Sequence, residues 1–235
     1  MNKNIKYLAT DKMSDLICEN YNLLLVMSRF GLALGFGDKT VEQVCEQQGV
    51  HTGTFLAVVN FVDDEYAVLD HHDHLISLEA LMNYLRQAHS YFLDFNLPTI
   101  RRKLMDALDY AQSEVAFLIL KFFDEYVREV RIHMEYENQT VFEYVERLLQ
   151  GEDRLGYEIR VFAERHNQIE EKLTELKNIM VKYYPSSSMN HMLNSVLFDI
   201  YSCEEDLALH CRVEDHMFIP LIREYENKMA NYAGE

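Results

Sequence analysis

Residues 131–145, RIHMEYENQTVFEYV, place His133 and Glu137 four positions apart in a stretch without glycine or proline. A second stretch, ALHCRVEDHMFIPLI, repeats that spacing with His210 and Glu214. Residues four apart lie on one face of an α-helix, about 6 Å from each other, so a ring nitrogen and a carboxylate can be directed at one point. The repeated His–Glu pair therefore predicts two helices that each supply two ligands to a metal site.

The segments around these pairs have apolar residues recurring at intervals of three and four, which is typical of amphipathic helices. Only three prolines and eight glycines interrupt the 235 residues, so an all-α fold is predicted. The breaks between the long segments are short, which favours an up-down-up-down four-helix bundle. The four predicted helices cover residues 78–111, 113–150, 153–183 and 189–229.

The chain before the bundle has a different pattern, with shorter apolar segments separated by glycines. We expect residues 1–77 to form a small helical domain and residues 78–235 to form the bundle. The stretch DDEYAVLDHHDHLIS, residues 63–77, is interpreted as the linker, and its DHHDH motif as polar linker sequence in preference to a metal site.

Three helices are expected in the N-terminal domain. The stretch DKMSDLICENYNLLLVMSRFG has helical periodicity, with Asp11 or Ser14 available as its N-cap. Thr40 carries a capping signal for a second helix that ends at Gly49. The stretch HTGTFLAVVNFV is expected to form the third helix.

Each helix of the bundle carries a histidine. His166 follows His89 by 77 positions, and His210 follows His133 by the same number, as expected for a site with approximate two-fold symmetry. Any single histidine could instead be a packed core residue or a surface residue. A lone His–Glu pair at this spacing stabilises a helix by only a few tenths of a kcal/mol. Burial of the whole set without a metal would be costly. The predicted metal ligands are His89, His133, Glu137, His166, His210 and Glu214.

This ligand set can hold two metal ions. With both glutamates bridging, each metal would receive two imidazoles and two carboxylate oxygens, and an oxo or hydroxo bridge could complete five ligands. Imidazole and carboxylate ligands suit iron, although manganese or zinc would fit the same residues.

The balance of charges limits the partners of the chain. Its 22 Lys and Arg residues oppose 39 Asp and Glu residues, for a formal net charge of −17. Nucleic acids and anionic membrane surfaces are therefore disfavoured as partners. The four cysteines form no CxxC pair, and no apolar run reaches the length of a membrane span or a secretory signal. We expect free thiols and a cytoplasmic protein.

These motifs resemble the hemerythrin-like di-iron bundle and, more closely, the repair-of-iron-centres (RIC) family. The similarity lies in QAHSYFLDFNLPTI, EVRIHMEYENQTVFEYV, FAERHNQIEEKL and LALHCRVEDHMFIPLI. It implies a hemerythrin-like bundle after a small N-terminal domain, with the six predicted ligands holding two iron ions and both glutamates bridging. It also implies that Glu129, one turn before His133, lies near the metal, whereas an exposed charge is the alternative at that position.

One departure from the RIC pattern concerns the N-terminal domain. Members of that family carry a Cys-Cys pair before a GGKQT-like turn, but this chain has FGLALGFGDKT, with Gly35 and Phe36 at those positions. Cys18 and Cys45 lie elsewhere. The thiol-dependent part of any iron donation is therefore in question, while the di-iron centre is not.

The resemblance implies repair of iron-sulfur clusters damaged by nitrosative or oxidative stress. Iron donation or reduction of nitric oxide would be the activity, and damaged iron-sulfur proteins or NO and O₂ the partners. Whether the chain is an enzyme stays open. The alternatives are a hemerythrin-like O₂ or NO sensor and, less favoured because of the charge, a transcriptional regulator that uses residues 40–60. The sequence also leaves the oligomeric state open, with a homodimer as one candidate.

Overall fold

The structure is a computed structural model, and it divides the chain into two compact units, Met1–Ala88 with Val213–Glu235 and His89–Arg212. The described residues are helical apart from turns, loops and an isolated β-bridge between Lys12 and Thr40. The all-α fold class is therefore confirmed. The structure describes residues 6–63, 76–108, 114–151, 157–163, 170–185 and 191–232.

The N-terminal helices pack around an apolar core. Helix α4 contacts both α2 and α3, and the ring of Phe55 in α4 meets Phe30 edge-on at 5.5 Å between centroids. Phe55 is completely buried, and burial of such an aromatic ring stabilises a small helical unit. The helices are α1 (Met13–Glu19), α2 (Leu23–Arg29), α3 (Val41–Gln48) and α4 (Thr52–Asp63).

Helix α3 begins and ends where the sequence predicts. The Thr40 hydroxyl accepts a hydrogen bond from the Gln43 amide at 3.3 Å, and the Gln43 side chain accepts one from the Thr40 amide at 3.1 Å. This reciprocal arrangement satisfies two amides that the first turn leaves without helical partners. Gly49 ends the helix with φ of 71°, in the left-handed region that favours glycine.

The single helix predicted from DKMSDLICENYNLLLVMSRFG is wrong, because the segment forms two short helices. Asn20 is extended, with φ of −141°, and its side-chain oxygen accepts a hydrogen bond from the Asn22 amide at 3.1 Å. An asparagine that bonds to the backbone two residues later favours a turn over a helix. Neither predicted cap is used: α1 has Lys12 at its N-cap without a side-chain cap, and Asp11 accepts from the Leu8 amide.

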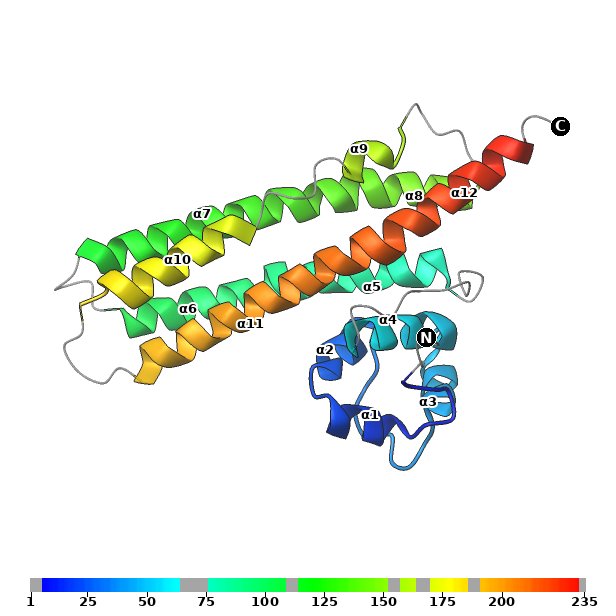
Figure 1. Cartoon of the computed structure of the whole chain (residues 1–235), viewed down its shortest axis with the longest axis horizontal. Helices are drawn as coiled ribbons and strands as arrows, with labels where there is room; N and C mark the ends of the chain where they lie inside the picture. Colours follow the sequence, from blue (N-terminus) through cyan, green and yellow to red (C-terminus); the bar gives the residue numbers. More distant parts are fainter. Residues whose placement is uncertain are drawn as a thin grey trace, which may run out of the picture. The chain divides into compact units, whose positions relative to one another are not determined.

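Four long helical segments appear in the order predicted (Figure 1), but the first ends at Ala107, and residues 157–159, predicted to belong to the third, are not helical. The first comprises α5 (Leu78–Ser90), η2 (Tyr91–Asn96) and α6 (Leu97–Ala107), the second α7 (Glu114–Tyr136), η3 (Glu137–Val141) and α8 (Phe142–Leu149), the third α9 (Arg160–Ala163) and α10 (Glu170–Tyr183), and the fourth α11 (His191–Val213), η4 (Glu214–Phe218) and α12 (Ile219–Tyr232). None of the described helices is long and apolar enough to cross a membrane. The boundary predicted between residues 77 and 78 stays a prediction.

In the unit His89–Arg212, ion pairs connect four helices in a ring, so that each helix is linked to two neighbours. Each of α6, α7, α10 and α11 is paired with two of the other three, so the four surround one core. The helices lie alongside one another in Figure 1. The pairs are Arg101–Asp124 (α6 to α7), Glu129–Lys172 (α7 to α10), Lys177–Glu204 (α10 to α11) and Lys103–Asp199 (α6 to α11).

Within the described residues, three of the long segments contain a turn of π-helix: η2, η3 and η4. A proline follows two of these turns: Pro98 is the second residue after η2, and Pro220 is the second after η4. Proline lacks an N–H group and collides with the carbonyl four residues earlier in a regular α-helix. A wider turn before the proline relieves that collision. No proline follows η3.

Candidate metal centre

The predicted ligands that the structure describes lie where α-helix gives way to π-helix. His133 is in the last turn of α7, and Glu137 is the first residue of η3. His210 and Glu214 have the same relation to α11 and η4. His89 is the next-to-last residue of α5, two positions before η2 begins at Tyr91. Single turns of π-helix occur frequently at functional sites, and here they recur at each described segment that carries a predicted ligand.

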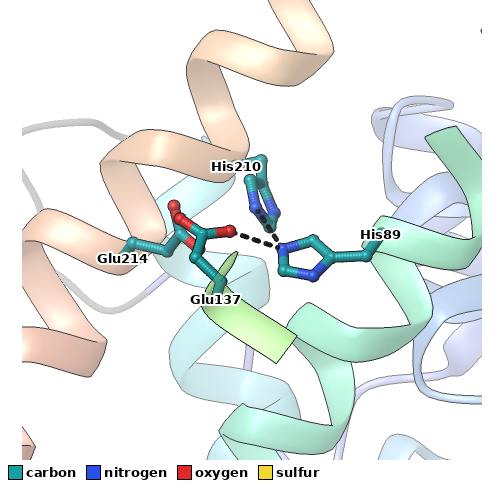
Figure 2. A group of neighbouring side chains, drawn as sticks. All are labelled: His89, Glu137, His210 and Glu214. Carbon is teal, nitrogen blue, oxygen red and sulfur yellow. Dashed lines mark hydrogen bonds and ion pairs between the residues drawn. The ribbon is translucent and has the colours of Figure 1, made fainter. Parts of the chain in front are cut away.

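Four of these side chains converge in the interior, as Figure 2 shows. His89 and His210 are each 1% exposed, and Glu137 and Glu214 are completely buried. One ligand atom from each residue lies within 4.8 Å of all the others. Charged carboxylates are almost never buried in this way unless a compensating group is present.

Three potential ligand atoms surround one point. The Nε2 atom of His89 lies 3.0 Å from Glu137 Oε2 and 3.2 Å from His210 Nε2. Two ligands placed about 2.1 Å from one metal ion at right angles to each other are about 3.0 Å apart, so these separations suit a shared metal. The donor set of two imidazoles and two carboxylates is also one that iron, manganese and zinc accept. The residues therefore fit a bound metal ion.

His133 lies on the other side of the Glu137 carboxylate. Its Nε2 atom is 2.8 Å from Glu137 Oε1, and its side chain is 17% exposed. The pair is therefore mostly buried, unlike an ordinary surface pair at this spacing. His133 lies outside the group of four that shares the 4.8 Å limit. His166 lies outside the described residues, so its assignment as a ligand stays a prediction.

Aromatic rings enclose the histidines. The Phe142 ring stacks on His89, with centroids 5.3 Å apart and planes 12° apart. Phe92 meets His210 nearly edge-on at 6.0 Å. Both phenylalanines are buried, so they limit the access of water and hold the imidazoles in place. An apolar shell of this kind controls the dielectric around a metal site.

Glu129 and His216 are not among the four converging side chains. Glu129 forms an ion pair with Lys172, and its side chain is 38% exposed. His216 is exposed in η4, with its ring 6.0 Å from Phe61. The DHHDH motif at residues 70–74 lies outside the described residues.

Sequence reasoning missed one polar neighbour of the site. Asn138 Oδ1 lies 2.9 Å from His89 Nδ1. The residue directly follows Glu137, and in a regular α-helix it would project well away from the Glu137 direction. Pro98 and Pro220 could have signalled the π-turns of two segments, but no comparable residue marks η3.

Comparison with known families agrees with this geometry. The family model described as the hemerythrin HHE cation-binding domain matches residues 80–222, more than half of the chain. The match includes all six predicted ligands. No curated protein and no solved structure matches the chain. Since the family model spans the helices that carry the buried His and Glu residues, the chain belongs to the hemerythrin HHE cation-binding domain family.

Proposed function

We propose that the chain is a non-haem di-iron protein, and the position of Glu137 is the observation that carries this proposal. The two carboxylate oxygens face different histidines, Oε1 facing His133 at 2.8 Å and Oε2 facing His89 at 3.0 Å. A carboxylate that bridges two metal ions directs its oxygens to two separate ligand groups in this way. A carboxylate that serves one ion would leave His133 with no function in binding.

This arrangement divides the ligands between two metal positions. The Nε2 atoms of His89 and His210 are 3.2 Å apart and would serve the first ion. His133 would serve the second, with His166 as its predicted partner. Glu214 is buried in the same group of ligand atoms and is the second candidate bridge.

Iron bound there would supply one-electron redox chemistry and coordination positions for small gases such as NO and O₂. The side chains around the metal position supply negative charge and an apolar environment. The buried glutamates provide negative charge that favours cations, and the rings of Phe92 and Phe142 limit the access of water.

We propose repair of iron-sulfur clusters damaged by nitrosative or oxidative stress as the role of this centre. The resemblance to the RIC family supports it, including the helices before the bundle. The missing Cys-Cys pair argues against donation of iron through thiols, because Gly35 and Phe36 occupy those positions in a glycine-containing loop. Reduction of NO at the metal centre would need no such thiols.

A hemerythrin-like O₂ or NO sensor is the second candidate, and the same lack of cysteines favours it. A sensor needs reversible gas binding and a partner surface, but neither an iron-donating thiol nor turnover. The two roles differ in one measurement: a repair protein restores the activity of a damaged cluster enzyme, and a sensor binds gas reversibly without doing so.

Anaerobic reconstitution with Fe²⁺ tests the metal centre. We expect two irons per chain in the wild type, close to one in His133→Ala, and none in the His133→Ala/His210→Ala double variant. Elemental analysis together with protein quantification gives these ratios. A double variant that still holds two irons would show that the ligands are assigned incorrectly. A wild type with two irons that fails to restore a damaged cluster enzyme would exclude the repair role alone.

A further inference from the structure

Both ring nitrogens of His89 have defined neighbours. Nε2 faces the candidate metal position, 3.0 Å from Glu137 Oε2 and 3.2 Å from His210 Nε2 (Figure 2). Nδ1 faces away from it and lies 2.9 Å from Asn138 Oδ1. The Phe142 ring stacks on the same imidazole. The orientation of the His89 ring is therefore determined largely by the segment from Glu137 to Phe142.

The contact with Asn138 selects one tautomer of His89. An amide oxygen only accepts hydrogen bonds, so Nδ1 carries the proton and donates it to Oδ1. In a neutral imidazole the lone pair then lies on Nε2. That is the nitrogen directed at Glu137 and His210, as a metal ligand requires. Ligating histidines in metalloproteins are commonly oriented by a hydrogen bond to the other ring nitrogen.

The two consecutive residues that reach the His89 ring lie at the start of a π-turn. Consecutive side chains in an α-helix point about 100° apart. The wider turn of a π-helix rotates less per residue, so Glu137 and Asn138 at the start of η3 project in more similar directions. The turn closes with a hydrogen bond from the Phe142 amide to the Glu137 carbonyl. It therefore brings a carboxylate to one side of the His89 ring and an amide oxygen to the other.

We propose that Asn138 is a positioning residue, which holds His89 in the Nδ1–H tautomer so that Nε2 binds the metal. This inference rests on the proposed metal centre. The amide orients the ring without adding negative charge to a site that already contains two buried glutamates. A carboxylate at position 138 would orient it equally but would also increase the basicity of the imidazole.

Zn²⁺ titration of the metal-free protein tests this role with a redox-inactive probe. Asn138→Leu keeps the approximate volume but cannot accept the hydrogen bond, and we expect zinc affinity to fall roughly 10- to 100-fold. Asn138→Asp restores the acceptor and should recover at least wild-type affinity. Asn96→Leu is the matched control: Asn96 is also partly exposed and lies in the π-turn η2, and its replacement should leave the affinity unchanged.

Nuclear magnetic resonance of the zinc-loaded protein gives a readout that a general packing defect would not produce. The wild type should show an exchange-protected His89 Nδ1–H resonance, which Asn138→Leu should lose and Asn138→Asp should regain. If Asn138→Leu does not fold, Asn138→Ser takes its place, because the shorter hydroxyl cannot reach Nδ1.

The outcomes separate this inference from the proposed function. Wild-type affinity and a retained Nδ1–H resonance in Asn138→Leu would overturn the positioning role while leaving the metal centre intact. Weaker binding that Asn138→Asp does not recover would also overturn it. Failure of the wild type to bind zinc or iron would instead contradict the metal centre itself.

Discussion

Glu137 is the residue on which the candidate centre depends most, since it contacts two histidines from different helices and is completely buried. A neutral amide cannot replace this carboxylate, because an amide carries no negative charge and has only one oxygen. A nearby surface glutamate differs from Glu137 in its burial and in its partner. Glu135, two residues earlier, is exposed and lies 3.8 Å from Arg131.

Glu137→Gln should lower the iron content from two ions to one or none per chain, because the amide cannot bridge. Elemental analysis after anaerobic reconstitution measures the change, and Glu135→Gln should keep two ions. A Glu137→Gln variant with full iron content would contradict the bridging role.

Cys45 provides a prediction about pH. Burial raises the pKa of its thiol to about 11, although a hydrogen bond with Thr52 partly opposes the shift. The folded state therefore favours the neutral thiol, and this contribution to stability is complete below the pKa of the unfolded chain, about 8.5–9. It is lost as the pH rises through 11.

The free energy of unfolding should therefore fall between pH 9 and pH 11, and it should fall less in Cys45→Ala. Chemical denaturation at several pH values measures the difference. Native-state alkylation at pH 8, located by mass spectrometry, should modify exposed Cys18 well before Cys45. Equal rates at the two positions would show that Cys45 is not protected.

At the scale of elements, the π-turns decide where the ligands point. The spacing of His133 and Glu137 could be interpreted from the sequence, because four positions in an α-helix define a face. The position of Asn138 could not, because an α-helical register directs it elsewhere.

Deletion of the exposed residue Gln139 should convert η3 into a regular α-helical turn while α7 and α8 keep their packing. We expect far-ultraviolet circular dichroism to remain helical and zinc affinity to fall at least about tenfold, since Asn138 loses its position beside His89. Gln139→Ala keeps the extra residue and should bind as the wild type does. Wild-type affinity in the deletion variant would show that the π-turn is dispensable.

The ion pairs between helices should contribute differently to stability, because they differ in how far they are buried. Lys177 and Glu204 join α10 to α11 with side chains 10% and 20% exposed, and the Lys177 ammonium lies 4.3 Å from the Tyr201 ring centroid. Arg101 and Asp124 join α6 to α7 with side chains 41% and 43% exposed. Removing one partner of an ion pair lowers the free energy of unfolding strongly only where the remaining charge is left buried.

Lys177→Met should therefore lower the free energy of unfolding by about 3 kcal/mol. Arg101→Met should lower it by less than about 1 kcal/mol. Urea denaturation of the two variants measures both values. The double variant Lys177→Met/Glu204→Gln should recover much of the loss, and equal losses in the two single variants would contradict the dependence on burial.

At the scale of the whole molecule, metal binding should couple to stability because the ligands come from separate helices. Iron or zinc at 100 times its dissociation constant should add about 2.7 kcal/mol to the free energy of unfolding. The midpoint of thermal unfolding should rise by roughly 5–10 °C. Calorimetry before and after removal of the metal by a chelator measures the shift, and the His133→Ala/His210→Ala variant should show none.

The sequence by itself determined the all-α class, the four long segments and the pairing of His with Glu, because helical periodicity and i to i+4 spacing are local properties of the chain. It also indicated the family that the match over residues 80–222 establishes. Only the tertiary structure decided that His89, from a different segment, meets Glu137 Oε2 while His133 meets Oε1. It also decided that Asn138 contacts the far side of the His89 ring. These contacts depend on the packing of separate helices and on a π-turn that no local signal marks, so they follow from the assembled bundle and not from the spacing of residues along the chain.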